Sequence, residues 1–357
     1  MRGSFGVRHL AVVISIIVAG VGRLAAASFT VTDIGSLSGG SAAAGQININ
    51  GMVAGVSGFP HGSRNHAFFG DSRVRIRDLG CLAGGDYSAA FAVNSSNQVV
   101  GESNTATAVH AFWWTASSGM NDLGTLPGDN ASRAFGINNS GQVVGYSSGP
   151  SGERAFLWTS SSSMVNLGVL PGGDSSQAQA INNTGEIVGF SESLAGRHAF
   201  IWTKRSGMKD IGPLPGDQES RAQSINDSGE VVGWSSGPGG THAFLWSSSG
   251  GIRDLGSLAK STFAIALAIN NSGEVVGTST TSLGARAFLW SSADGIKDLN
   301  TLIPADANLV LTSAIGINDR GQIVAIGTVN ADSNHAVELD DPRHADVHTH
   351  VFVLTPS

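Results

Sequence analysis

Short apolar runs recur along this chain, each bounded by Gly, Ser, Asn or Pro. Residues 131–168 illustrate the pattern, with runs at 132–137, 142–146, 154–158 and 164–169. Short runs rich in aliphatic and aromatic residues predict β-strands. Both faces of the two middle runs are apolar, which predicts a sheet that is covered on both sides.

The four runs form a unit that repeats through the chain. A His/Arg-Ala-Phe triplet recurs every 44 residues, and an Asp-Leu-Gly-like triplet and an Ile/Val-Asn pair recur in the same register. A unit of this length with four strands is typical of a β-propeller blade. The triplets begin at His66, His110, Arg154, His198, His242 and Arg286, and the Asn residues of the pairs are Asn48, Asn94, Asn138, Asn182, Asn226, Asn270 and Asn318.

The two ends of the repeat array complement each other. The chain enters the array at 28–37, which resembles a fourth strand, and leaves it at 350–355, which resembles a third strand. A closed ring explains this division, because a blade shared by both ends removes the exposed sheet edges. We therefore predict an all-β, seven-bladed propeller of four-stranded antiparallel blades. The blades span about 42–80, 87–124, 131–168, 175–212, 219–256, 263–300 and 311–355, the last completed by 28–37.

The last blade is the irregular one. Ala325 replaces the Gly of the Val-Val-Gly motif, and the connection from Asp298 to Ile317 is longer than its counterparts. Residues 335–339 are an alternative third strand for this blade, in which case the tail would be an appendage.

The turn between the first two strands carries an Asn and, three residues later, a Gly. The Asn side chain can hydrogen-bond to its own backbone, and Gly accepts a positive φ. In the second blade the Gly is replaced by Asn97, the residue type that best tolerates that conformation. These tight turns mark one face of the ring, and we expect longer, more variable loops on the other.

Residues 1–27 have the features of a cleavable signal peptide. Arg2 and Arg8 precede an apolar run at 10–21, and Ala25-Ala26-Ala27 offers a cleavage site before Ser28. The alternative is an uncleaved membrane anchor, for which the run is short. We therefore expect residues 28–357 to be the propeller and the protein to be secreted, with the periplasm or the cell surface as other destinations.

The charge and the cysteine content of the chain limit the classes of partner that we expect. The formal charge is −7, and loss of a leader that contains three Arg and no acidic residue makes it −10. Because the chain has no basic stripe, we expect neither nucleic acid nor an anionic membrane surface as a partner. The single Cys81 cannot form an internal disulfide. We expect a monomer with no membrane span after cleavage.

The repeat motifs resemble a known family. His-Ala-Phe-Leu-Trp, Asp-Leu-Gly-x-Leu-Pro-Gly-Gly-Asp and Ile-Asn-Asn-Ser-Gly-x-Val-Val-Gly are similar to the HAF repeat of extracellular bacterial proteins. The resemblance covers nearly all of residues 28–357. It implies an extracellular protein and supplies no catalytic residues.

Polar residues at channel-facing positions of the first strands cluster in blades 3 to 5. This cluster contains Arg133, Gln177 and Arg221, with Gln179 and Gln223 two residues further on, whereas the other blades have Ala43, Ala89, Ile265 and Ser313. The loops that enter the same blades carry Asp129, Asp174 and Asp217. We predict a ligand site here, because repetition alone would not create the asymmetry. The alternatives are a merely wet channel and Asp residues that cap their own turns.

The last loop offers a second candidate. His344, Asp346, His348 and His350 alternate, so an extended chain would place them on one face as ligands for a divalent metal. The spacing matches no standard zinc module, and a solvated acidic loop is the alternative. No other cofactor is expected.

Repeated His and Trp residues have simpler explanations. The exchange of His and Arg at the head of the third strands suits a hydrogen bond there better than catalysis. Trp114, Trp158, Trp202, Trp246 and Trp290 are expected to pack between blades, although a multivalent lectin could use them for sugars.

No His-Glu-x-x-His, phosphate loop or dinucleotide fingerprint is present. We therefore expect a non-enzymatic binding scaffold for an extracellular polymer, glycan or protein, with the ligand at the loop face and channel mouth. The alternatives are a hydrolase or lyase acting on polysaccharide-like substrates at the channel mouth and the multivalent lectin.

Overall fold

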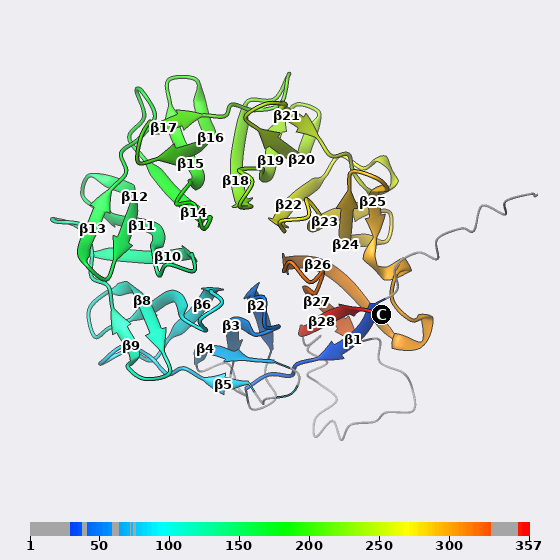
Figure 1. Cartoon of the computed structure of the whole chain (residues 1–357), viewed down its shortest axis with the longest axis horizontal. Helices are drawn as coiled ribbons and strands as arrows, with labels where there is room; N and C mark the ends of the chain where they lie inside the picture. Colours follow the sequence, from blue (N-terminus) through cyan, green and yellow to red (C-terminus); the bar gives the residue numbers. More distant parts are fainter. Residues whose placement is uncertain (1–28, 38–40, 59–63, 72, 74–75, 330–348) are drawn as a thin grey trace, which may run out of the picture.

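The computed structural model describes residues 29–37, 41–58, 64–71, 73, 76–329 and 349–357. These residues form seven four-stranded antiparallel sheets arranged as the blades of a ring (Figure 1). The predicted seven-bladed propeller is therefore confirmed. The predicted signal peptide lies outside the described residues. No segment of the described chain forms an apolar helix long enough to cross a membrane.

Each of the first six blades is a meander whose innermost strand comes first. Blades 1 to 3 comprise β2 (Ala42–Ile47), β3 (Val53–Gly58), β4 (Asn65–Gly70), β5 (Arg77–Asp78); β6 (Ser88–Val93), β7 (Val99–Asn104), β8 (Val109–Thr115), β9 (Gly119–Asp122); and β10 (Ala131–Ile137), β11 (Val143–Gly149), β12 (Gly152–Thr159), β13 (Ser162–Asn166). Blades 4 to 6 comprise β14 (Ser176–Ile181), β15 (Ile187–Ser193), β16 (Gly196–Thr203), β17 (Gly207–Asp210); β18 (Glu219–Ile225), β19 (Val231–Gly237), β20 (Gly240–Ser247), β21 (Gly251–Asp254); and β22 (Ala264–Ile269), β23 (Val275–Thr281), β24 (Gly284–Ser291), β25 (Gly295–Asp298).

Blade 7 joins the two ends of the chain. It contains β26 (Leu309–Ile317), β27 (Ile323–Val329), β28 (His350–Pro356) and, outermost, β1 (Phe29–Asp33). Strand β1 pairs antiparallel with β28, from Phe29 opposite Pro356 to Asp33 opposite Phe352. These strands, blue and red in Figure 1, lie side by side. The third strand of blade 7 is thus 350–356, and the alternative, 335–339, lies outside the described residues.

The hydrophobic core lies between blades. The Phe of each described His/Arg-Ala-Phe triplet is fully buried, and in blade 2 Phe112 packs among Ala54, Ala67 and Phe69 of blade 1. The Gly of the second strand is required by close packing. A Cβ on Gly145 would lie 1.9 Å from the carbonyl oxygen of Arg133. Ala325 avoids such a clash in a blade whose first two strands contain a second register shift, between Leu311 and Ser313.

Buried serines connect neighbouring blades at four junctions of the ring, from blade 1 to blade 5. The Ser132 hydroxyl accepts a hydrogen bond from the N–H of Ala111 in blade 2 (2.8 Å) and donates one to the carbonyl of Gly124 (2.6 Å). We call this contact the serine latch. The same latch is made by Ser88, Ser176 and Ser220.

The tight turns and the loops lie on opposite faces of the ring, as the sequence predicts. The Gly of the tight turns has a positive φ, for example +75° at Gly141, and Asn97 at the equivalent position has φ +61°, so this prediction is confirmed. The expected long loops are only partly present. In blades 3 to 6 the second and third strands are joined by two-residue connections, at 150–151, 194–195, 238–239 and 282–283.

Deletion of residues 29–33 should open the ring. Relative to a chain that begins at residue 29, we expect the free energy of unfolding to fall by at least about 3 kcal/mol, since burial of one Phe side chain alone contributes about 1.5–3 kcal/mol. Urea denaturation measures the change. Equal stability of the two chains would contradict closure through β1.

Candidate functional site

The central channel has two different mouths separated by an aliphatic collar. We call the mouth on the side of the Asn turns the turn mouth, and the opposite one the loop mouth. The collar consists of the last residues of the first strands: Ile47, Val93, Ile137, Ile181, Ile225, Ile269 and Ile317.

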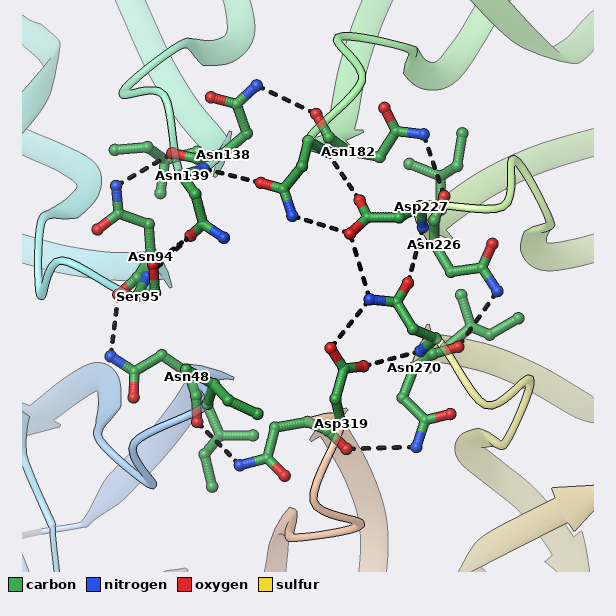
Figure 2. Close-up of a pocket in the computed structure, with 18 of the residues that line it drawn as sticks. Asn48, Asn94, Ser95, Asn138, Asn139, Asn182, Asn226, Asp227, Asn270 and Asp319 are labelled. Atoms are coloured by element: carbon green, nitrogen blue, oxygen red, sulfur yellow. Dashed lines mark hydrogen bonds between the residues drawn. The ribbon is translucent and has the colours of Figure 1, made fainter.

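A closed ring of hydrogen bonds surrounds the turn mouth. The side-chain amide of each repeated Asn donates to the backbone carbonyl of the corresponding Asn in the next blade, at 2.8 to 3.2 Å, and Asn318 donates to Asn48 to complete the circle. Figure 2 shows this arrangement around the mouth. Each of these Asn side-chain oxygens also accepts two backbone N–H groups of its own turn, as Asn138 does from Ser140 and Gln142. We call this arrangement the asparagine ring.

The residues that follow the Asn ring line a cavity of about 190 Å³. Asp227 and Asp319 both accept a hydrogen bond from the amide of Asn271, at 3.2 and 2.9 Å. Burial raises the pKa of Asp227, but hydrogen bonds from Asn183 and Asn271 outweigh burial, so its pKa is lowered overall. Sequence reasoning had assigned the Asn pairs to turns alone. Only the seven-fold recurrence of Asn at the end of an inward strand could have pointed to this polar mouth.

The asparagine ring can be tested with a substitution that keeps the turn. N94D retains the acceptor for Ser96 and Gln98 but loses the donor to the Asn138 carbonyl. We expect a loss of about 1–3 kcal/mol in the free energy of unfolding, because the two hydrogen bonds that the buried amide donates, to the Asn138 carbonyl and to Gln98 Oε1, are replaced by contacts between oxygen atoms. The control is N130D, at an exposed residue of a loop on the opposite face, where the change should stay within about 0.5 kcal/mol. Equal effects of both changes would contradict the ring.

The predicted polar residues lie near the loop mouth, and Arg133 is held there by a buried acid. The guanidinium Nε of Arg133 lies 2.8 Å from a carboxylate oxygen of Glu102, whose side chain is 6% exposed. The Tyr87 hydroxyl donates to the other oxygen of Glu102 at 3.0 Å. Burial and the charge of Glu102 raise the pKa of Tyr87 to about 12. Arg133 and Tyr146 also line a cavity of about 270 Å³ between blades 2 and 3.

The glutamines of blade 4 form a short polar row. The Gln177 amide donates to Glu153 at 2.7 Å, and Gln179 donates to the Gln177 oxygen at 3.4 Å. Gln223, the equivalent of Gln179 in blade 5, is partly buried.

Arg221 is stacked between aromatic rings. Its guanidinium carbon lies 4.4 Å from the centre of the Phe190 ring and 5.0 Å from that of the Trp234 ring. Its Nε–H is buried and has no hydrogen-bond partner among the described residues. Burial and the nearby charge of Arg197 lower the pKa of Arg221. Arg197 itself donates to Glu192 at 2.7 Å.

Among the described residues, the three predicted Asp residues are not paired with the polar residues predicted on the first strands. Asp129 accepts from the Ser147 hydroxyl at 2.7 Å, and Asp217 pairs with His242 at 3.1 Å. The carbonyl of Asp174 accepts a hydrogen bond from Arg154. In the described chain, none of these three residues has a hydrogen bond or ion pair with Arg133, Gln177 or Arg221.

The histidines at the head of the third strands bind neighbouring carboxylates. His350 pairs with Asp33 at 2.7 Å and so links β28 to β1. The expected hydrogen bond at the strand head is confirmed by the same pairing in other blades, of His66 with Asp78, His110 with Asp122 and His198 with Asp210.

Of the metal candidates, His344, Asp346 and His348 lie outside the described residues. Within the described chain no group of three or more His, Cys, Asp or Glu could hold a metal ion. The Trp residues pack against the clusters between blades, as expected: Trp114 and Trp290 are buried, and Trp158, Trp202 and Trp246 are partly buried.

The two tyrosines of the chain offer a test of the loop-mouth geometry. Burial is the main cause that raises the pKa of both Tyr87 and Tyr146. We expect the phenolate absorbance of the folded protein to stay low past pH 10, where the unfolded chain ionises. In the Y146F variant, the remaining signal should titrate near pH 12.

The same shift makes stability depend on pH. Between about pH 10 and 12 the unfolded chain loses the Tyr87 proton while the folded chain keeps it, so stability falls as the pH rises through this window. Y87F should reduce that fall. Ionisation of Tyr87 near pH 10 would contradict the buried pairing with Glu102.

Comparisons with known proteins agree on the fold. Neither a protein-family profile nor a curated protein matches the chain. Among solved structures, a streptogramin B lyase is 13% identical with a TM-score of 0.55, covering 92% of this chain and 98% of that chain. An oligogalacturonate lyase in complex with manganese is 9% identical with a TM-score of 0.56, covering 93% and 96%. A virginiamycin B lyase from Staphylococcus aureus is 12% identical with a TM-score of 0.54, covering 92% and 99%. These similarities show the propeller fold alone.

Proposed function

We propose that this chain is an exported, non-enzymatic binding scaffold whose ligand occupies the polar sector of the loop mouth. The sector consists of Arg133, Gln177, Gln179 and Arg221. The observation that carries the proposal is Arg221, a guanidinium oriented by two aromatic rings. Its side chain has no hydrogen bond or ion pair with any described residue, so the terminal Nη groups of the guanidinium are the donors left for a ligand.

The ligand class follows from the donors. A planar guanidinium binds carboxylate or sulfate through paired hydrogen bonds, and the neighbouring Gln side chains suit hydroxyl groups. An anionic extracellular polysaccharide provides both kinds of group. The HAF-like repeat motifs and the signal-like leader support an extracellular setting for such a ligand.

The ionisable groups of the sector favour binding over catalysis. A general base works best with a pKa near the working pH. The pKa values of Tyr87 and Tyr146 are instead raised, and Glu102 is neutralised by Arg133. A hydrolase or lyase of polysaccharide-like substrates is the alternative function, which the same experiment distinguishes.

Binding can be measured with a panel of neutral and anionic polysaccharides. We expect an anionic member to bind the wild-type chain and R221A to bind it at least about 10-fold more weakly, since a hydrogen bond to a charged group contributes about 1.5–3 kcal/mol. The control is R253A, because Arg253 also stacks on an aromatic ring, that of Trp290 at 5.0 Å, but is exposed away from the sector.

The outcomes separate the possibilities. Binding that is lost in R221A and kept in R253A supports the scaffold. Cleavage products that disappear in R221A would establish the enzymatic alternative. Binding of anionic polysaccharide with equal affinity by wild type and R221A would remove this sector as the site.

A further inference from the structure

The junction between blades 5 and 6 departs from the repeat at three linked positions. The first is the loop that enters blade 6, where Ala259 and Lys260 have φ values of +51° and +55°. The corresponding residues in blades 3 and 5 are Pro followed by Gly, and those glycines, Gly128 and Gly216, have φ values of +90° and +94°. Two successive non-Gly residues are therefore held in a strained conformation, and such strain concentrates at functional sites.

The second departure is the loss of a serine latch. Ala264 occupies the position of Ser132 and Ser220, so no hydroxyl connects the two blades there. A cavity of about 390 Å³ lies at this place, lined by Ala264, His242, Asp254, Lys260 and the neighbouring Gly256, Ser257 and Ser261.

The third departure is the pairing of His242. In blades 1, 2, 4 and 7 the equivalent His binds the Asp at the end of the fourth strand. His242 instead binds Asp217, whose side chain is 6% exposed. Asp254 keeps only one hydrogen bond within the described chain, which it accepts from the Gly256 N–H at 2.7 Å. Its second oxygen is thus available on the wall of the cavity.

We propose that this cavity is a second binding site, specific for a zwitterionic ligand of the α-amino acid class. Lys260 and Asp254 line the same cavity but form no ion pair with each other. A carboxylate placed near Lys260 and an ammonium placed near Asp254 would neutralise both. A simple anion would meet the charge of Asp254, and a simple cation would meet that of Lys260, so neither complements the cavity. The site goes beyond the polysaccharide-binding sector and is independent of it.

The first experiment compares probes that differ only in charge. Titration calorimetry of the full chain would use a panel of free amino acids, with acetate, methylammonium and methyl glucoside as the anionic, cationic and neutral probes. We expect one amino-acid site per chain and affinities for the other three probes at least about 10-fold lower. Failure of every amino acid to bind overturns the proposal, as does binding of acetate, methylammonium or methyl glucoside as tightly as the best amino acid.

The second experiment restores the repeat. A264S supplies the missing hydroxyl and narrows the cavity, and K260G removes the charge and the strain at position 260. Each should weaken amino-acid binding at least about 10-fold, because a narrowed cavity or a lost charge partner reduces the complementarity. K260G should also raise the melting temperature, since Gly accepts a positive φ without strain.

The matched control is A42S. Ala42 holds the latch position at the junction between blades 7 and 1, so this change adds the same hydroxyl elsewhere. It should leave amino-acid binding unchanged. Wild-type affinity in A264S, or an equal loss in A42S, would contradict a site between blades 5 and 6. Because K260G is expected to be more stable than wild type, its loss of binding cannot be attributed to unfolding.

Discussion

The asparagine ring is the interaction on which the rest of the structure depends. Each of the seven amides fixes its own turn through the side-chain oxygen and its neighbour through the side-chain nitrogen. Because the last amide, on Asn318, reaches the carbonyl of Asn48, the first strands are held at a fixed spacing around the channel. Local turn geometry and global closure are thus set by the same side chains, all buried or nearly so.

Other contacts connect neighbouring blades and the outer strands of a blade. The serine latches bind neighbouring blades at the first strand, and the His–Asp pairs bind the third strand to the fourth. In most of the ring, the polar groups of the repeated motifs therefore have backbone or side-chain partners. Places where a residue leaves the repeat, such as Arg221 and Lys260, have polar groups with no structural partner within the described chain. These are the places where we infer ligands.

Much of the fold could be predicted from the sequence because the repeat imposes it. Seven copies of one motif fixed the blade number, and the unmatched ends at Phe29 and His350 fixed the closure. Positive φ at the turn glycines and at Asn97 followed from turn chemistry.

The candidate site was less accessible to sequence reasoning. Its partners come from other blades, so the stacking of Arg221 on Phe190 and the pairing of Arg133 with Glu102 leave no local pattern. Asp129 and Asp217 were grouped with the channel residues because of their blades, whereas their side chains turn to Ser147 and His242. The contacts of a polar loop residue depend on how the blades are arranged in the closed ring, which the local sequence does not show.

Native-state hydrogen exchange followed by mass spectrometry tests the central claim that closure makes the ring a single cooperative unit. Peptides from the inner strands of every blade should exchange with the same free energy of opening, since no blade can leave the asparagine ring alone. Inner strands that open blade by blade, with the terminal blades first as in an open array of repeats, would contradict the account.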